Sequence, residues 1–272
     1  MKKKAHKLIN NFWDIMFQPE MLVLPGQLAF FFILSVVPIL TLISIGAASF
    51  NINLEFINSF IAQEFGENIS NLLIPSTINP EANLGFIITF IFGFIIASNG
   101  ASSIIVTSNT IYGIKDQGFI RRRVKSFIMT LFIVILFTFI LIVPLFGQKI
   151  IEFIKLYSIN NFLTKAFNIL SSPISWIIIF ILIKIIFTMA PDQRIPSSQT
   201  TYGALFTSVG WIISTFIYSF YINHYAMYSL YYGGLTNIII LMLWFYLLAY
   251  IFTIGMALNY RKHKDKYTKE ED

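Results

Sequence analysis

Lys184 lies well inside one of the apolar stretches of this chain of 272 residues. A charge inside a membrane-spanning helix is costly, so by default it marks a substrate or ion path. Lys184 lies six residues before Ala190, which is about 9 Å along a helix, and a lysine stem can cover most of that distance to the membrane surface. Two interpretations therefore stay open: a role in a substrate path, where Lys184 attracts an anionic group, and a structural role through snorkelling or a hydrogen bond.

A dense polar run, Ser98-Asn99-Gly100-Ala101-Ser102-Ser103, lies in the second apolar stretch and is followed by Asn109. Asn99, Ser102 and Asn109 can line a polar path, since an amide offers both a donor and an acceptor. Small residues also recur there at four-residue spacing, which lets helix backbones approach closely. Packing between helices is thus the alternative to a cavity wall.

Two other regions contain candidates for a substrate path, and each of them also has a purely structural interpretation. Pro38 follows Ser35 inside the first apolar stretch, where a proline removes one helix hydrogen bond and kinks the helix. The kink either opens a cavity or only sets the shape of the helix. Tyr232 and Gly233 belong to a tyrosine-rich connection after the fifth stretch, which is typical of an aromatic belt at the membrane interface and alternatively forms an aromatic mouth for a ligand.

The sequence shows no catalytic constellation. Cysteine is absent, which excludes disulfides and thiolate metal sites, and the three histidines, His6, His224 and His263, lie outside the apolar stretches. Carboxylates are scarce and none lies within those stretches, so no acid pair, histidine-based triad or metal cluster is predicted. We therefore expect no enzyme, no cofactor and no bound metal. No ATP-binding motif is present, so energy for transport would come from a gradient or a partner.

The elements that position these residues are six long apolar stretches. They lie at about residues 27–50, 84–108, 127–147, 172–190, 203–222 and 235–259. A hydrocarbon core of about 30 Å needs about 20 helical residues, and a backbone in lipid must satisfy its own polar groups. Charged residues make up 12% of the chain, roughly half the share in soluble domains. The prediction is an all-α polytopic protein with one membrane domain over residues 27–259.

Charge predicts the orientation of this domain. Segments 1–26, 109–126, 191–202 and 260–272 carry 15 of the 19 basic residues. The positive-inside rule therefore places both termini in the cytoplasm. Short amphipathic interfacial helices are expected at 5–18 and 54–73 and, more weakly, at 149–157, with a charged tail from 260. The Arg121–Arg123 run is expected to contact anionic lipid at the cytoplasmic face.

Several short motifs together resemble the YihY/BrkB family of bacterial inner-membrane proteins. They comprise Gln27–Pro38, Ala97–Gly100, Asn109–Gly113, Gly203–Leu205, Trp211, Phe216, Tyr218, Tyr232–Leu235, Leu243–Tyr246 and Gly255–Asn259. The resemblance covers about residues 20–260, and the order and spacing of the motifs make it specific. It implies six transmembrane helices with cytoplasmic termini.

The chain departs from the family pattern at two places. Ala257 stands where the closing family motif usually has Glu, and Ile95 or Ile96 stands where Trp is expected. Members of the family have been labelled ribonuclease BN, and one is linked to serum resistance. The ribonuclease label finds no support in this sequence, because the short inner loops offer only Asp116 and Asp192 and no histidine.

The leading hypothesis is a transporter or lipid translocator for an amphipathic or anionic substrate. Its candidate path residues are Ser35, Pro38, Asn99, Ser102, Asn109, Lys184, Trp211, Tyr232, Gly233, Trp244 and Asn259. The alternative is a non-transporting envelope scaffold, and a membrane-tethered ribonuclease carries little weight. Expected partners are membrane lipids, anionic lipid at the cytoplasmic face, and either further copies of the chain or an envelope protein; nucleic acid is not expected.

Overall fold

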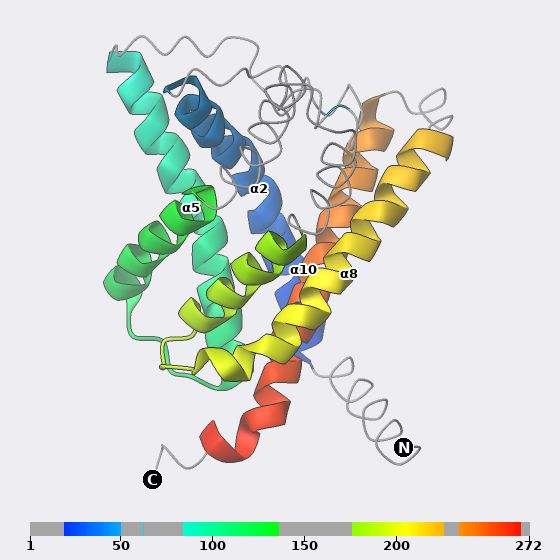
Figure 1. Ribbon diagram of the computed structural model, residues 1–272. Helices are drawn as coiled ribbons and strands as arrows, with labels where there is room; N and C mark the ends of the chain where they lie inside the picture. The colour runs from blue at the N-terminus through cyan, green and yellow to red at the C-terminus, as the bar shows by residue number, and fades with distance from the viewer. Residues whose placement is uncertain (1–18, 50–61, 63–83, 136–175, 226–233, 268–272) are drawn as a thin grey trace, which may run out of the picture.

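The computed structural model describes residues 19–49, 62, 84–135, 176–225 and 234–267, and all the regular secondary structure in these ranges is helical (Figure 1). The long helices are α2 (Glu20–Ser49), α5 (Leu84–Tyr112), α8 (Ser197–Tyr225) and α10 (Gly234–Tyr267). All four are long and apolar enough to cross a membrane. They correspond to the first, second, fifth and sixth predicted spans, and the all-α class is confirmed for the described residues.

The helices extend beyond the predicted spans at the ends that carry polar and basic residues. The start of α8 at Ser197 lies six residues before the predicted boundary, and α10 continues to Tyr267 rather than ending at 259. The predicted connection 191–202 is therefore partly helical. Hydropathy marks where a helix enters the hydrocarbon, whereas backbone hydrogen bonding decides where the helix ends. At the start of α8, Thr200 and Thr201 also donate side-chain hydrogen bonds to the carbonyl of Ser197.

Two shorter helical segments lie where the third and fourth spans were predicted. One covers residues 119–135 and so begins eight residues before the predicted span 127–147. The other, Trp176–Met189, falls within the predicted span 172–190. Its 14 residues correspond to about 21 Å, less than a hydrocarbon core requires. Six complete spans therefore remain a prediction.

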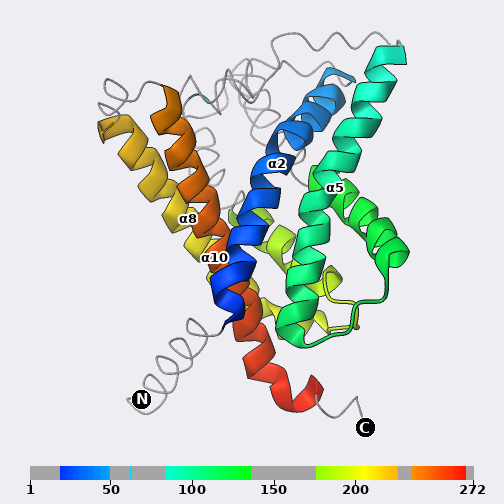
Figure 2. The same cartoon turned by 180° about the vertical axis from the view of Figure 1, so that it is seen from behind.

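The long helices form a row, in the order α5, α2, α10 and α8, in which neighbours lie side by side (Figures 1 and 2). The helix of residues 119–135 and the helix Trp176–Met189 run obliquely across one face of this row, the front face in Figure 1. In Figure 2 the row is seen from its other face, with α2 and α5 in front. The described part of the protein thus has two layers of helices.

The main apolar core lies between the two layers. It contains buried residues of every described helix: Leu28, Ala29, Ala101, Ile104, Ile105, Tyr112, Met129, Leu182, Ile183, Ile186, Phe187, Ala190, Ile195, Ala204, Ala249, Phe252 and Met256. Phe252 of α10 is its centre, with ring contacts to Phe187 at 4.8 Å, Trp211 at 5.9 Å and Phe32 at 6.1 Å. Edge-to-face and stacked contacts of this kind hold aromatic helices together beyond simple burial.

The short connections 113–118 and 190–196 lie at one end of the row, the lower end in Figure 1. The beginning of α2 and the end of α10 lie at this same end. The described parts of the four basic segments, which the charge pattern assigns to one face of the membrane, therefore lie at the same end of the molecule. That this face is the cytoplasmic one stays a prediction. The expected amphipathic segments 5–18, 54–73 and 149–157 fall outside the described residues, apart from residue 62.

Candidate functional site

Lys184 lines a groove of about 390 Å³ beside the helix Trp176–Met189 and the start of α8. The other lining residues are Phe180, Ile181, Ile185, Thr188, Met189 and Ser197. The Lys184 ammonium lies 6.0 Å from the centre of the Phe180 ring, so part of its charge faces an aromatic surface. The Thr188 hydroxyl lies 2.8 Å from the Lys184 carbonyl, to which it donates a hydrogen bond, and 3.0 Å from the Thr200 hydroxyl.

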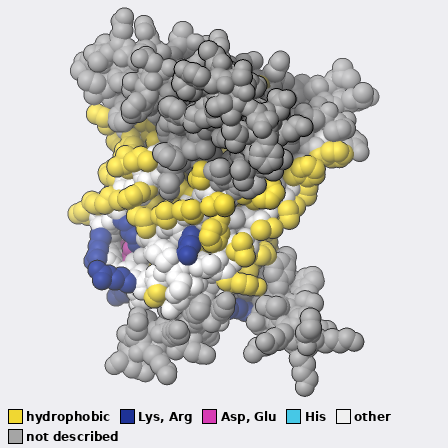
Figure 3. Space-filling view, viewed as in Figure 1, with side chains coloured by type: hydrophobic (Ala, Val, Ile, Leu, Met, Phe, Trp, Pro, Cys, Tyr) yellow, Lys and Arg dark blue, Asp and Glu magenta, His cyan; other side chains and the backbone are white. Residues whose placement is uncertain are grey.

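This groove combines one cation with walls that are mainly apolar. Ile181 of the lining is exposed, and so are Trp176 and Ile177 about one turn earlier on the same helix, on a surface that a membrane would cover. In Figure 3, basic side chains lie on this face of the molecule among hydrophobic ones. A molecule that fits such a surface has an anionic group for the ammonium and an apolar portion for the walls. Of the sequence-predicted candidates, only Lys184 lines this groove.

The polar run of α5 is used in contacts between helices. The amide nitrogen of Gly100 donates to the Ser35 hydroxyl at 3.1 Å, and that hydroxyl donates to the Ala97 carbonyl at 3.2 Å. Asn99 accepts a hydrogen bond from Arg123 at 2.8 Å through its side-chain oxygen. These bonds attach α2 and the helix of residues 119–135 to α5. Ser102 is partly buried on the same helix.

Asn109 lies in a polar cluster that joins α5 to both short connections. Its side-chain amide donates to Asp192 Oδ2 at 2.8 Å, and its carbonyl oxygen accepts the backbone N–H of Asp192 at 2.9 Å. Lys125 donates at 2.7 to 2.8 Å to Asp192 Oδ1 and to the carbonyls of Ala190 and Pro191. Gln117 donates to the Asp192 carbonyl at 2.9 Å. We refer to Asn109, Gln117, Lys125 and Asp192 as the Asp192 cluster.

The Asp192 cluster keeps a charged pair in a mostly buried position. Burial raises the pKa of the Asp192 carboxyl, but the hydrogen bonds from Lys125 and Asn109 outweigh burial, so the pKa lies below its usual value. Burial lowers the pKa of the Lys125 ammonium, and its bond to Asp192 offsets only part of that effect. Asp192 is therefore a structural anion near neutral pH, unlike a proton carrier, whose pKa must lie near the working pH.

Acid is expected to weaken the Asp192 cluster. Since the folded-state pKa of Asp192 lies below the unfolded value of about 3.9, its contribution to stability is present above that value and is lost as pH falls through the folded pKa. The melting temperature of the purified protein should therefore fall as the pH is lowered from about 5 through the folded-state pKa of Asp192. Asp192→Asn should flatten this part of the curve, and equal slopes in both proteins would contradict the assignment.

The remaining candidate residues that the structure describes also lie in contacts within or between helices. Asn259 accepts the Gly203 N–H at 2.6 Å and donates to the Thr200 carbonyl at 3.2 Å, which joins α10 to α8. Trp211 donates to the Leu248 carbonyl at 2.9 Å across the same pair of helices. The Trp244 ring lies 5.3 Å from that of Tyr218. Pro38 is partly buried inside α2, and Tyr232 and Gly233 lie outside the described residues.

Sequence reasoning missed the residues that complete these contacts. Lys125 was considered only among the basic residues of segment 109–126, and Asp192 only as one of two acids in the short inner loops, yet they are the centre of one cluster. Thr188 and Ser197 join Lys184 in the groove. Asp192 follows Pro191 in a short connection, and that combination is the one local signal that could have suggested a constrained carboxylate.

Comparison with known proteins assigns the chain to a family. The family model described as virulence factor BrkB matches residues 16–272. The chain belongs to the BrkB family. This confirms the resemblance seen in the motifs, and the four long apolar helices agree with a multi-pass membrane protein. No solved structure matches the chain.

Among curated BrkB relatives, the putative ribonuclease-like protein YfkH of Bacillus subtilis (strain 168) is 27% identical over 252 residues, which cover 91% of this chain and 92% of YfkH. A UPF0761 membrane protein of Vibrio campbellii is also 27% identical, over 88% of this chain and 77% of its own length. A UPF0761 membrane protein of Chlorobium chlorochromatii is 22% identical, over 86% of this chain and 55% of its own length.

The two departures from the BrkB motifs lie in different surroundings. Ala257 is buried with Met21 and Ile254 where α10 meets α2, so the usual glutamate would place a carboxyl group in this contact. Ile95 and Ile96 are exposed on α5, on a surface that a membrane would cover. The carbonyl of Ile95 accepts hydrogen bonds from Ser98 and from Arg123.

Proposed function

We propose that this BrkB-family protein binds an anionic amphiphile in the Lys184 groove and carries it across the membrane. The observation that supports the proposal is a single ammonium in a mainly apolar groove that opens beside the exposed residues Trp176, Ile177 and Ile181. An ammonium is a compact point charge that suits a phosphate or carboxylate. An anionic lipid is thus the substrate class that best matches the groove.

The lining residues have separate roles in this proposal. Lys184 attracts the anionic group, and Phe180, Ile181 and Ile185 contact the apolar portion. Thr188 and Ser197 offer hydroxyls at the end of the groove nearest the connection 190–196. The groove lies outside the packed core, so a substrate would move along the surface of the bundle rather than through its centre. Energy would come from a gradient or a partner.

Loss of the charge at Lys184 should slow translocation. Purified protein in liposomes would be assayed with fluorescent phosphatidylglycerol and phosphatidylcholine by dithionite quenching. Lys184→Met keeps the length and apolar character of the side chain but removes its ammonium, so flipping of phosphatidylglycerol should fall about tenfold, the effect of about 1.4 kcal/mol. Lys184→Arg is the matched control and should retain most activity.

The variant Asn99→Ala distinguishes a substrate path along the Lys184 groove from one along the polar side chains of α5. Because Asn99 bonds Arg123 and does not line the groove, this variant should flip lipid at the wild-type rate. A loss in Asn99→Ala with normal rates in Lys184→Met would instead support a path along the second span. Equal flipping by wild type and Lys184→Met, with both proteins folded, would refute the groove proposal.

A non-transporting scaffold is the second candidate. It is favoured by the use of Ser35, Asn99, Asn109 and Asn259 as hydrogen-bonding partners between helices or with a neighbouring connection. A scaffold predicts no flipping and no effect of Lys184→Met on function in cells. The liposome assay therefore distinguishes the two candidates directly.

The proposal assigns no enzymatic activity to this chain, although the name of its relative YfkH includes the words ribonuclease-like. Within the described ranges, no group of three or more His, Asp or Glu residues is placed to hold a metal ion. Ribonuclease activity that copurifies with the protein at constant specific activity and requires a divalent metal would overturn this part of the proposal.

A further inference from the structure

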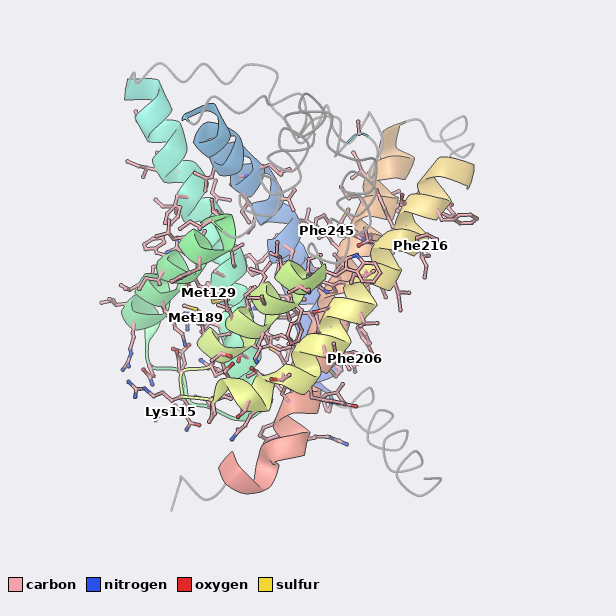
Figure 4. All side chains as sticks on the ribbon, in the orientation of Figure 1. Lys115, Met129, Met189, Phe206, Phe216 and Phe245 are labelled. Carbon is pink, nitrogen blue, oxygen red and sulfur yellow. The ribbon has the colours of Figure 1, made fainter. Side chains whose placement is uncertain are left out.

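The connection 113–118 and the first turns of the following helix carry an unusual density of positive charge. Five basic residues lie between 115 and 125: Lys115, Arg121, Arg122, Arg123 and Lys125. Figure 3 shows dark-blue side chains gathered at the edge of the molecule in this region, beside hydrophobic ones. Lys115 lies beneath the oblique helices, at a level above the end of α10 (Figure 4).

Three of the five cations already have structural partners. Lys125 is paired with Asp192, and Arg122 is paired with Asp116. Arg123 donates to the Asn99 side chain and to the Ile95 carbonyl, and its guanidinium lies 4.9 Å from the centre of the Phe127 ring. Lys115 and Arg121 are exposed, and no carboxylate in the described part of the chain pairs with either. We call these two residues the free basic pair.

Exposed apolar side chains lie next to Arg121 on the helix of residues 119–135. Phe119 is 69% and Ile120 is 78% exposed, and both immediately precede Arg121. Val124 and Ile128 continue the exposed apolar surface at helical spacing from Ile120. Large apolar side chains with this exposure are stable in a membrane protein where lipid covers them. The free basic pair therefore lies where the hydrocarbon ends and the headgroups begin.

The backbone that carries Lys115 is held in a defined shape. Gly113 and Gly118 have φ values of 67° and 101°, a region that side-chain-bearing residues rarely adopt. The Gly118 N–H donates to Asp116 Oδ1 at 2.7 Å, and Gln117 bonds the connection 190–196 through the Asp192 carbonyl. Arg123 and Arg122 attach the helix that carries Arg121 to α5 and to Asp116. The two free cations are thus presented by a structured support.

We infer that Lys115 and Arg121 bind the phosphodiester of an anionic phospholipid of the surrounding leaflet, whose acyl chains contact Phe119, Ile120 and Val124. The geometry favours a lipid over a free phosphate because the cations adjoin a large apolar surface that only a lipid would cover. This lipid site is separate from the Lys184 groove and does not depend on translocation. A resident lipid here would fix the depth and tilt of the helix of residues 119–135.

Lipid binding would be measured by native mass spectrometry of the purified full-length protein, titrated with phosphatidylglycerol and with phosphatidylcholine of the same acyl chains. The test variant is Lys115→Gln with Arg121→Gln, which removes two exposed charges that pair with no carboxylate in the described ranges. Each basic residue near an anionic lipid contributes about fivefold, so the preference for phosphatidylglycerol should fall about 25-fold. Arg194→Gln is the matched control, because it removes an exposed cation from the other connection, 190–196, and should keep this preference at the first bound lipid.

Two further measurements distinguish a lipid phosphate from free inorganic phosphate. Inorganic phosphate, added at the concentrations used for lipid, should not displace bound phosphatidylglycerol, and 0.5 M salt should weaken binding by the wild type more than by the double variant. An unchanged lipid preference in the double variant overturns the inference. Displacement of the lipid by inorganic phosphate overturns it as well, in favour of a free-anion site. If the protein does not flip lipid, only the proposal for the Lys184 groove fails. The lipid site at Lys115 and Arg121 is tested separately, by the binding measurement.

Discussion

Gly203→Ala is expected to destabilise the protein by at least about 3 kcal/mol, the upper end of overpacking effects in a close-packed core. A Cβ atom at Gly203 would overlap the carbonyl oxygen of Gly255 on α10 and would lie 2.5 Å from the Asn259 side-chain nitrogen. The obstacle is a backbone atom, so no side-chain rotation relieves it. α8 and α10 would have to separate, which would also break the hydrogen bond from Gly203 to Asn259.

The free energy of unfolding would be measured by titration with sodium dodecyl sulfate in mixed micelles, monitored by circular dichroism. Gly93→Ala is the matched control, because a Cβ there meets nothing within 4 Å and alanine favours helix by up to about 1 kcal/mol. Gly210→Ala should be intermediate, since its Cβ would lie 2.6 Å from Cγ2 of Ile251, a side-chain atom rather than a backbone atom. A Gly203→Ala protein as stable as the wild type would show that α8 and α10 do not pack this closely.

Lys125→Met is expected to cost about 2 to 4 kcal/mol of stability. The side chain of Asp192 is only 4% exposed, so the substitution leaves a nearly buried carboxylate without its cation. The carbonyls of Ala190 and Pro191 lose a donor at the same time. The connection 190–196 should loosen from α5 and from the helix of residues 119–135. Faster hydrogen exchange in that connection would accompany the lower unfolding free energy.

A surface ion pair supplies the control for Lys125. Arg122 and Asp116 are paired with side chains 24% and 39% exposed, so Arg122→Gln should cost less than about 1 kcal/mol. Asp192→Asn combined with Lys125→Met should be less damaging than the sum of the single variants, because the second change removes the charge that the first leaves unpaired. Additive losses, or equal losses for Lys125→Met and Arg122→Gln, would exclude a coupled buried pair.

These predictions rest on contacts between residues far apart in the chain. Asn109 and Asp192 are separated by 83 positions, and Gly203 and Asn259 by 56. Asn99 was recognised as a polar residue within the second apolar stretch and Asn109 as one directly after it, but their partners could not be named. A hydrogen bond between helices depends on which faces meet, and helices that are apolar on all sides carry no pattern that marks the buried face.

The sequence alone determined the class of the protein, its four long helices and its family. Long apolar runs can only be helices in lipid, and short motifs in a fixed order identify relatives without any knowledge of their contacts. Tertiary structure decided that Lys184 lines a groove with Thr188 and Ser197, and that Lys125 closes the Asp192 cluster. Hydropathy is a property of the chain, whereas a groove or a buried ion pair arises only when separate helices pack at a particular rotation and height.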